Sequence, residues 1–379
     1  MNILFYTWDS CNSIRILCAL KKLGHNVFTY EHKLSGYEVD ADFMHDALFM
    51  IHREKIDCCF SINYIPVLSS IANSVGIPYI SWVQDSPQYP LYSPTRNFAG
   101  NYEYIFDKEE FLRLKAKGSE RIYQATLGSD PEFFMSKIKE NGSISSEICF
   151  LGSLYDQTDF DRFNCENDYL KGYLAGLVNA QVSLYGCNLI ESCLSPSKAE
   201  KILALCGDDI PEGYDIDPEY AAAFILERKV TGMERFRYLK AIGERYNLTI
   251  YTNSPINPLI NADWQGTADY EAKMPRIFNG AKINLHFAPR NIHSAASLRV
   301  FDVLACKGFL LTTWQPEIVE LFDDGTELVT FSETDEMLDK IDYYLKHEDE
   351  RSKIARAGYD KILKEYTYDK VLQGFFDNL

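Results

Sequence analysis

A segment near residue 300 combines cationic, hydroxyl and small side chains in an order that suits anion binding. It runs from Arg290 to Asp302 (RNIHSAASLRVFD) and follows an apolar run that predicts a strand. Ser297 is a good helix N-cap, so the first N–H groups of the next helix would point at an anion. Arg299 adds a fork that fits phosphate, and Asp302, one turn later, could accept bonds from ribose hydroxyls. The alternative is a capped helix with a surface Arg–Asp pair.

The same segment holds further candidate ligand-binding residues beside the expected helix start. Its small side chains let the backbone of Ser294 and Leu298 approach a ligand, and Arg290 adds a second cation. Two histidines, His286 and His293, could bond phosphate or a sugar, although a lone histidine is more often structural. Arg290, Ser294 and Leu298 are therefore candidate binding residues, and His293 is a candidate catalytic residue.

A second group of cations lies at residues 228–235 (RKVTGMER), with three cations in eight residues of an acidic chain. The segment is expected to precede the helix that leads into a strand at Leu248–Tyr251. In that position Lys229, Thr231 and Arg235 could bind an anion. The alternative is a solvated run of charges.

Polar residues also follow three other expected strands. Gly152 and Ser153 predict a tight turn with free N–H groups, a weak signal because glycine is common after strands. Asp9 and Asp85 follow two strands in the first third of the chain, where a carboxylate could deprotonate a hydroxyl group. Either aspartate could instead close a turn or cap a helix, which is the more common use.

These segments require a scaffold that brings the ends of strands together. Short apolar runs alternate with helical patterns in two parts of the chain, which predicts two doubly wound parallel sheets. The expected strands are 2–7, 27–30, 58–62, 79–83 and 102–106 in the first part, and 148–151, 248–251, 283–286, 309–312 and 328–331 in the second. Residues 157–226 lack strand signals and predict a helical insertion. Ligands are expected in a cleft at the carboxyl ends of the strands.

Charge limits the class of partner. The chain has 379 residues and a formal net charge of −17. Such a protein repels a phosphate backbone at long range, so a nucleic acid or an anionic membrane is not an expected partner. A local cationic pocket can still bind one nucleotide.

The cysteine pattern and the absence of several motifs further limit the classes of protein to which the chain could belong. Ten cysteines are present, without a CxxC pair and without Cys/His spacing typical of zinc, so we expect reduced thiols, no metal site and a cytoplasmic location. Neither a signal peptide nor an apolar run long enough to span a bilayer is recognised. The motifs GxGxxG, GxxxxGK[ST], GxSxG and HExxH are absent, which disfavours dehydrogenases, P-loop NTPases, α/β-hydrolases and zincins.

The order of several segments resembles the CgeB-like glycosyltransferases, a family named after a spore maturation protein. The resemblance covers most of the chain except residues 157–226. In the C-terminal part it rests on INLH (283–286), LRVFDVLACKGFLLT (298–312), PEIV (316–319), FDDG (322–325), ER (350–351), ARAG (355–358) and YTY (366–368). In the N-terminal part it rests on FSINY (60–64), YISWV (79–83), DSP (85–87) and FLGSLY (150–155).

The resemblance implies a GT-B fold, in which two Rossmann-like domains face a cleft. It implies an acceptor domain at residues 1–143, a nucleotide-sugar domain at 144–363, and a last helix at 364–379 that crosses back to the first domain. The family is distantly similar to the retaining family 4 enzymes, whose Glu-x7-Glu motif falls here on Ser294 and Asp302. Their phosphate-binding Arg/Lys pair would fall near 228–235.

The sequence therefore predicts a glycosyltransferase of the hexosyltransferase type that retains configuration. The expected donor is a nucleotide-sugar, UDP-sugar ahead of GDP-sugar, and no cofactor or metal is required because cationic side chains replace the metal. The acceptor is a glycan, a protein or another cell-surface molecule, oriented by Asp9 or Asp85, either of which would act as the base if the enzyme inverts configuration instead. Two alternatives stay open: an epimerase or hydrolase of nucleotide-sugars on the same fold, and an inactive module that binds sugar or protein.

Overall fold

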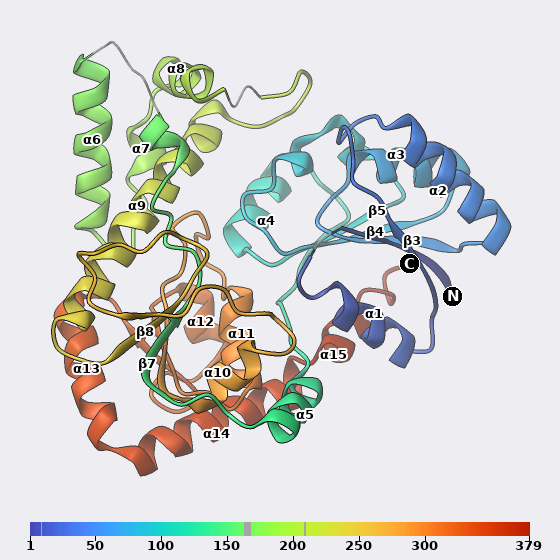
Figure 1. Ribbon diagram of the computed structural model, residues 1–379. Coiled ribbons are helices and arrows are strands. Elements are labelled where there is room, and N and C mark those ends of the chain that lie inside the picture. Colours follow the sequence, from blue (N-terminus) through green and yellow to red (C-terminus); the bar gives the residue numbers. More distant parts are fainter. Residues whose placement is uncertain (9, 163–167, 208–209) are drawn as a thin grey trace.

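The chain forms two α/β domains joined side by side (Figure 1). The structure is a computed structural model, and it describes residues 1–8, 10–162, 168–207 and 210–379. Each domain is built on one parallel sheet of six strands with helices on its faces, which confirms the predicted pair of doubly wound domains.

The N-terminal sheet has the strand order β2-β1-β3-β4-β5-β6. Its strands are β1 (Asn2–Thr7), β2 (Asn26–Glu31), β3 (Cys58–Ile62), β4 (Tyr79–Val83), β5 (Asn101–Ile105) and β6 (Ile122–Gln124). The central strands β3 and β4 are buried along their whole length, as expected for continuous apolar runs in a parallel sheet. The helices of this domain are α1 (Ser13–Lys22), α2 (Ala41–Glu54), α3 (Pro66–Val75) and α4 (Lys108–Ala116), with 3-10 turns at Tyr89–Tyr92 and Pro94–Asn97.

The C-terminal sheet has the order β12-β11-β10-β7-β8-β9, so β7 and β10 are neighbours at its centre. Its strands are β7 (Ser146–Leu151), β8 (Leu248–Tyr251), β9 (Asp263–Trp264), β10 (Ala281–His286), β11 (Leu310–Thr313) and β12 (Val329–Phe331). Its helices are α5 (Pro131–Asn141), α10 (Met274–Gly280), α11 (Leu298–Ala305), α12 (Pro316–Leu321), α13 (Thr334–Lys346) and α14 (Glu348–Glu365). The short strands β6 and β9 are absent from the prediction, because two or three residues carry no recognisable pattern.

The insertion between β7 and β8 is helical, as predicted. It contains a 3-10 turn (Asp159–Arg162), α6 (Asp168–Val182), α7 (Ile190–Cys193), α8 (Pro196–Cys206) and the first half of α9 (Pro218–Gly243). The prediction that residues 228–235 precede a helix is wrong, because they lie inside α9. The one glycine in this segment, Gly232, does not interrupt the helix. It allows the loop after β7 to approach, since a Cβ atom on Gly232 would stand 2.3 Å from the carbonyl oxygen of Tyr155.

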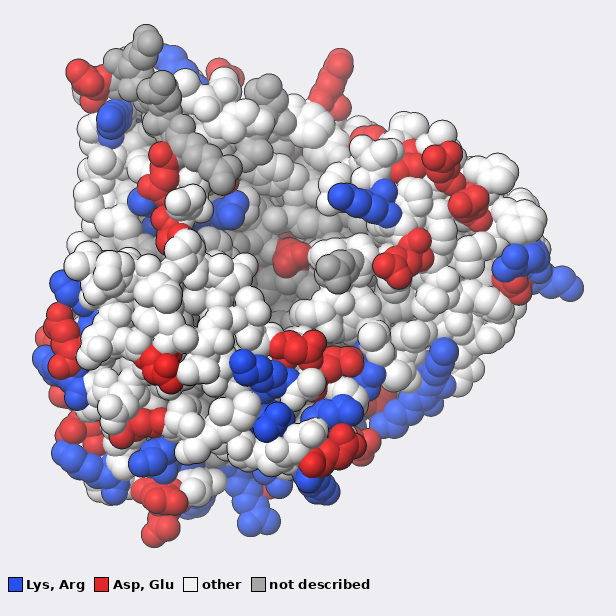
Figure 2. Space-filling view, viewed as in Figure 1, with Lys and Arg blue, Asp and Glu red and all other residues white. Residues whose placement is uncertain are grey.

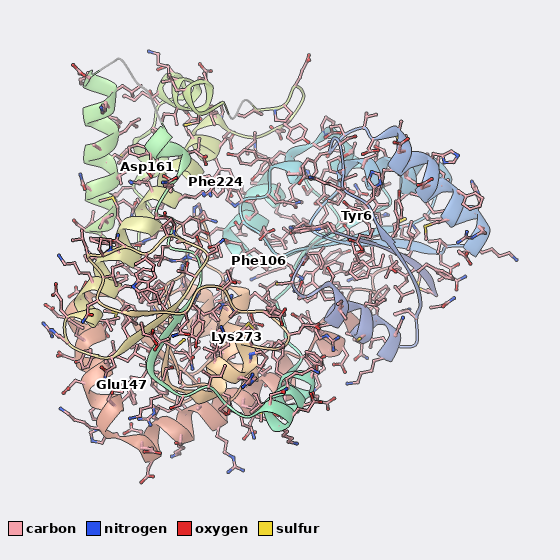
Figure 3. All side chains as sticks on the ribbon, viewed as in Figure 1. Tyr6, Phe106, Glu147, Asp161, Phe224 and Lys273 are labelled. Atoms are coloured by element: carbon pink, nitrogen blue, oxygen red, sulfur yellow. The ribbon has the colours of Figure 1, made fainter. Side chains whose placement is uncertain are left out.

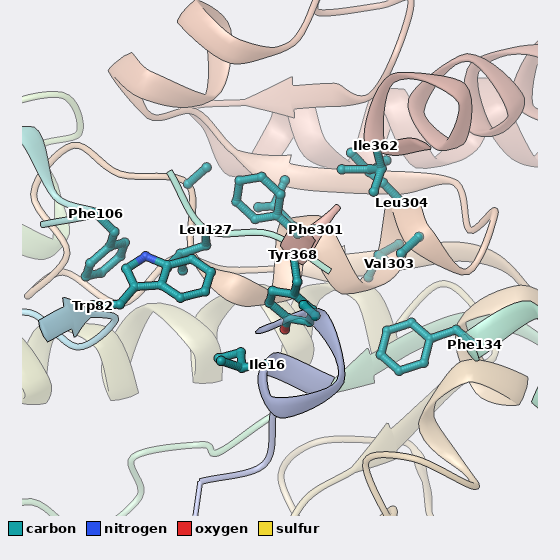
Figure 4. Packing of buried hydrophobic residues seen from close by; sticks show 14 of the residues in the cluster. Ile16, Trp82, Phe106, Leu127, Phe134, Phe301, Val303, Leu304, Ile362 and Tyr368 are labelled. Carbon is teal, nitrogen blue, oxygen red and sulfur yellow. The ribbon is translucent and has the colours of Figure 1, made fainter. Parts of the chain in front are cut away.

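The two domains share their buried cores. One hydrophobic cluster joins Trp82 and Phe106 of the first domain to Phe301 and Leu304 of the second (Figure 4). The last helix, α15 (Tyr368–Gln373), packs against α1 and contributes to the same cluster. Although α5 directly follows the N-terminal sheet in the sequence, it packs on the C-terminal domain, where it contacts α10, α11 and α14. The domain boundaries at residues 143 and 363 stay predictions.

A second cluster joins the insertion to the N-terminal domain. It combines Leu91 and Tyr92 with Leu174 and Tyr220 of the insertion. The Tyr220 hydroxyl donates a hydrogen bond to the buried carboxylate of Glu110 on α4. The insertion therefore belongs to the C-terminal half of the chain but packs on the N-terminal domain.

Candidate functional site

Arg235 is buried where the loops after β7 and β10 meet. Its guanidinium donates hydrogen bonds to the carbonyl oxygens of Ser153, at 2.5 Å, and of Phe287, at 2.6 Å. The Tyr155 ring lies 4.9 Å from its central carbon atom. Burial lowers the pKa of Arg235 to about 10, so the group stays positively charged at neutral pH. Within the described residues no carboxylate forms an ion pair with it, and its Nε atom has no hydrogen-bond partner.

His286 ends β10 beside the same cation. Burial lowers its pKa well below the usual value, and the charges of Arg235 and Arg299 lower it further. The imidazole is therefore neutral at physiological pH, and both guanidinium groups lie near it. Its Nε2 atom pairs with the hydroxyl of Ser297 at 2.8 Å.

Ser297 stands at the N-cap position of α11, as predicted, but its hydroxyl does not cap the helix. It faces His286 instead, which corrects the expected role of its side chain. The first turn of α11, which starts at Leu298, consequently has no side-chain cap. Backbone N–H groups at such a helix start favour an anion.

Arg299 and Asp302 form a pair, but it is not the exposed surface pair considered above. Arg299 Nη1 lies 3.4 Å from a carboxylate oxygen of Asp302, which is only 1% exposed. The other carboxylate oxygen of Asp302 accepts a hydrogen bond of 2.8 Å from the Tyr270 hydroxyl. Burial raises the pKa of Asp302 to about 6, and Arg299 opposes this shift. The expected contact of Asp302 with ribose hydroxyls does not fit this arrangement, because its oxygens face Tyr270 and Arg299.

The other predicted residues of α9 already have partners within the protein. Lys229 pairs with Asp161, and Arg228 pairs with Asp159 at 3.1 Å. The Thr231 hydroxyl is buried; it donates to a backbone carbonyl one turn earlier and accepts from the backbone N–H of Arg290. Lys229 and Thr231 therefore hold α9 in place, and Arg235 alone of the three predicted residues reaches the strand ends.

Two predicted residues of the loop after β10 are neutralised by glutamates of α9. Arg290 forms a two-bond ion pair with Glu234, at 2.5 and 2.8 Å. His293 pairs with Glu227 at 3.0 Å, and although burial acts in the opposite direction this pair raises the pKa of His293 to about 10. Both side chains line a small pocket of about 160 Å³. Neither is free to act as an acid, a base or a phosphate ligand, which corrects their predicted roles.

Ser294, Gly152 and Ser153 also have structural partners. The buried Ser294 hydroxyl lies 3.0 Å from Asp107 of the N-terminal domain and 2.7 Å from Glu317, so it joins the two domains. The N–H of Gly152 donates to a carbonyl of β8, and the Ser153 hydroxyl accepts from the next-but-one N–H. The turn after β7 therefore does not offer the free N–H of Gly152 that was expected.

On the N-terminal side, Asp85 follows β4 as predicted and is exposed. Its carboxylate accepts a hydrogen bond of 2.6 Å from the side chain of Asn63. The other predicted aspartate, Asp9, lies outside the described residues.

Four carboxylates of the site were missed: Asp107, Glu227, Glu234 and Glu317. Each pairs with a loop residue far away in the sequence, so no local motif identifies them. The only available signal was a glutamate directly before a cation, at Glu227 and Glu234.

Two kinds of site are absent from the part of the chain that the structure describes. No group of three or more His, Cys, Asp or Glu side chains could hold a metal ion. No helix there is both long enough and apolar enough to cross a membrane.

Comparison with known proteins agrees with this arrangement. Residues 228–377 match a family described as glycosyl transferase-like. No match was found among curated proteins.

The fold is shared with solved glycosyltransferases. A glycosyltransferase of Rickettsia africae ESF-5 is similar over 100% of this chain and 97% of its own, with a TM-score of 0.53 and 12% identity. HepE of Anabaena, solved with UDP-glucose, is similar over 100% and 99%, with a TM-score of 0.53 and 10% identity. Sucrose-phosphate synthase of Thermosynechococcus elongatus is similar over 100% and 98%, with a TM-score of 0.55 and 7% identity. The chain therefore has the two-domain GT-B fold, and the part that carries Arg235 and Arg299 resembles the glycosyl transferase-like family.

Proposed function

We propose that the chain is a glycosyltransferase that takes a sugar from a nucleotide-sugar. The observation that carries this proposal is the buried cation Arg235 at the meeting point of the loops after β7 and β10. A buried charge without a carboxylate partner is costly unless a ligand supplies the opposite charge. A diphosphate supplies that charge. HepE, which shares the fold, was solved with UDP-glucose, and a UDP-sugar is therefore the preferred donor over a GDP-sugar.

The donor diphosphate lies between Arg235, Arg299 and the start of α11 in this proposal. Negative charge grows on the leaving diphosphate as the glycosidic bond breaks. Fixed guanidinium and N–H groups in a site of low dielectric stabilise that charge without reorganising. The cations take the place of a metal ion, so the reaction is proposed to need neither metal nor cofactor.

The acceptor hydroxyl approaches from the N-terminal domain. Asp85, held by Asn63, orients this hydroxyl toward the donor sugar. As proposed from the resemblance, the enzyme is a CgeB-type hexosyltransferase that retains configuration. It acts in the cytoplasm on a glycan, a protein or another cell-surface acceptor.

A screen of donors tests the proposal. The protein is incubated with UDP-glucose, UDP-galactose, UDP-N-acetylglucosamine and GDP-mannose, and release of UDP or GDP is measured with EDTA present. We expect release from at least one UDP-sugar, and a fall of at least tenfold in kcat/KM for Arg299→Ala. Equal release by wild type and Arg299→Ala would contradict the proposed donor site.

One observation favours an inactive binding module as the second candidate. Ser294 stands at the first position of the Glu-x7-Glu motif of family 4 enzymes and contacts Asp107 and Glu317. Because a serine occupies this position, no carboxylate can contact the donor sugar from it. Binding of UDP without turnover of any donor would favour this candidate. Product analysis with and without acceptor separates transfer from epimerisation or hydrolysis.

A further inference from the structure

A large pocket of about 1050 Å³ lies between the N-terminal domain and the insertion. One wall comes from the carboxyl ends of the N-terminal strands, with Trp8, Asn63 and Asp85. The opposite wall comes from the insertion, with Tyr214 and Phe224. The surface is visibly hollowed between the two halves of the molecule (Figure 2). This volume lies just above the roughly 300–1,000 Å³ of small-ligand sites, so it has room for several sugar rings.

Aromatic side chains line both walls of the pocket. Trp8 and Tyr37 on the N-terminal side are 37% and 55% exposed, high values for such large rings. Tyr214 and Phe224 add rings from the insertion, and Tyr89 adds one from the N-terminal domain. Rings bury apolar area with little loss of side-chain freedom, and their faces suit the C–H faces of a sugar.

The charges on the pocket wall nearly cancel. Its acids are Glu31, Asp85 and Asp159, and its basic side chains are Lys33, Arg228 and His32. Arg228 and Asp159 already pair with each other at 3.1 Å. A pocket with this balance neither attracts a polyanion nor repels a neutral ligand. The remaining carboxylates and amides are suited to hydrogen bonds with hydroxyl groups.

The insertion is fixed across the pocket by contacts with the N-terminal domain. The Tyr214 hydroxyl donates a hydrogen bond of 2.6 Å to Glu38. The Tyr89 hydroxyl donates one of 3.0 Å to the carbonyl oxygen of Ala221, and its ring lies 6.1 Å from that of Phe224. Phe224 accordingly lies on the side of α9 that faces the N-terminal domain (Figure 3). The insertion wall is thus preformed.

We propose that this pocket binds a neutral oligosaccharide as the acceptor, and that the insertion selects it. Tyr214 and Phe224 form one platform for sugar rings, and Trp8 and Tyr37 form the other. Asp85 at the inner end meets the hydroxyl that receives the sugar. The role of the bound oligosaccharide as acceptor rests on the proposed function, whereas its binding does not.

Binding of neutral trisaccharides tests the inference. Maltotriose, cellotriose and chitotriose are titrated into the whole protein by calorimetry, with and without UDP. The variants are Phe224→Ala in the insertion and the exposed Tyr37→Ala, which keeps the test valid if the first variant folds poorly. Tyr169→Ala is the matched control, because Tyr169 is an exposed aromatic residue of α6 in the same insertion and outside the pocket.

We expect at least one trisaccharide to bind, and the Kd to rise about tenfold in Phe224→Ala and Tyr37→Ala, as for the loss of one aromatic contact. Tyr169→Ala should bind like the wild type. The inference is overturned if no trisaccharide binds at millimolar concentration, or if the pocket variants bind as well as the control. Failure of UDP to bind counts against the proposed function alone, because the trisaccharides are also tested without UDP.

Discussion

The two sheets of this chain are alike in architecture and differ in what their strands present. Both have six parallel strands, with β3 and β4 at the centre of one sheet and β10 and β7 at the centre of the other. The N-terminal ends carry Trp8, Asn63 and Asp85 around a nearly neutral pocket. The C-terminal ends carry His286, whose pKa burial and the charges of Arg235 and Arg299 hold well below its usual value. One scaffold thus provides two chemistries, because ligand-binding groups lie in loops and on one helix rather than in the strands.

α9 shows the same contrast within a single element. Its first half belongs to the insertion, and its cations Arg228 and Lys229 are paired with Asp159 and Asp161. Its second half places Arg235 at the strand ends, where two carbonyl oxygens accept hydrogen bonds from its guanidinium group. Charge in the sequence therefore does not identify a ligand site until the counter-charges are placed.

The largest expected effect is on kcat, and it distinguishes the N-terminal, acceptor side from the C-terminal, donor side. Asp85→Asn removes the exposed carboxylate of the N-terminal side and keeps the shape of the side chain. We expect kcat to fall about a hundredfold, as when an acceptor hydroxyl is no longer held in position, while the Kd for UDP stays unchanged. Steady-state kinetics and calorimetry measure the two quantities. A change in UDP affinity with unchanged kcat would reverse the assignment of the two sides.

A pH experiment tests a contact that belongs to neither ligand side. Burial raises the pKa of Glu110 to about 7, and the hydrogen bonds from Tyr220 and Tyr92 oppose the shift. The folded state therefore keeps a proton on Glu110 that the unfolded state loses above its ordinary pKa of about 4.5. The stabilising contribution of the protonated group is complete below pH 4.5 and is lost as the pH rises through 7.

Glu110→Gln keeps a neutral side chain at every pH. The wild type should lose roughly 3 kcal/mol of unfolding free energy relative to this variant as the pH rises from 4.5 to 8. Urea denaturation at each pH measures this difference. UDP affinity should be the same in both proteins. A stability difference that does not vary with pH would show that Glu110 is ionised in the folded state.

A substitution at Gly232 tests the close packing of α9 against the loop after β7 on the C-terminal side. Gly232→Ala would place a Cβ atom 2.3 Å from the Tyr155 carbonyl oxygen and push the loop after β7 away from α9. We expect a loss of about 1–3 kcal/mol in stability and weaker UDP binding. Gly176→Ala in α6 is the control, because a Cβ atom there meets open space and should stabilise the helix by up to about 1 kcal/mol. Equal melting temperatures for both variants would contradict the close packing.

Much of the fold was predictable from the sequence, because buried parallel strands are short apolar runs such as Cys58–Ile62 and Tyr79–Val83. The continuity of α9 through 228–235 was not, because Gly232 and three cations resemble a loop. Arg228 and Arg235 lie two helical turns apart on the same face, so helix phase does not separate their roles. The difference depends on Asp159, far away in the sequence. In the same way Ser294 and His293 resemble ligands until Asp107 and Glu227 are placed beside them.

Calorimetric titration of UDP into the wild type, Arg235→Met and Lys229→Met tests the central claim most directly. Both substitutions remove a cation from the same helix, but Lys229 is paired with Asp161 and Arg235 has no carboxylate partner among the described residues. We expect a Kd about tenfold to a hundredfold higher for Arg235→Met, the loss of one charge-assisted hydrogen bond to phosphate, and an unchanged Kd for Lys229→Met. Equal affinities of all three proteins, with Arg235→Met folded by circular dichroism, would contradict a diphosphate site at the junction of the loops after β7 and β10.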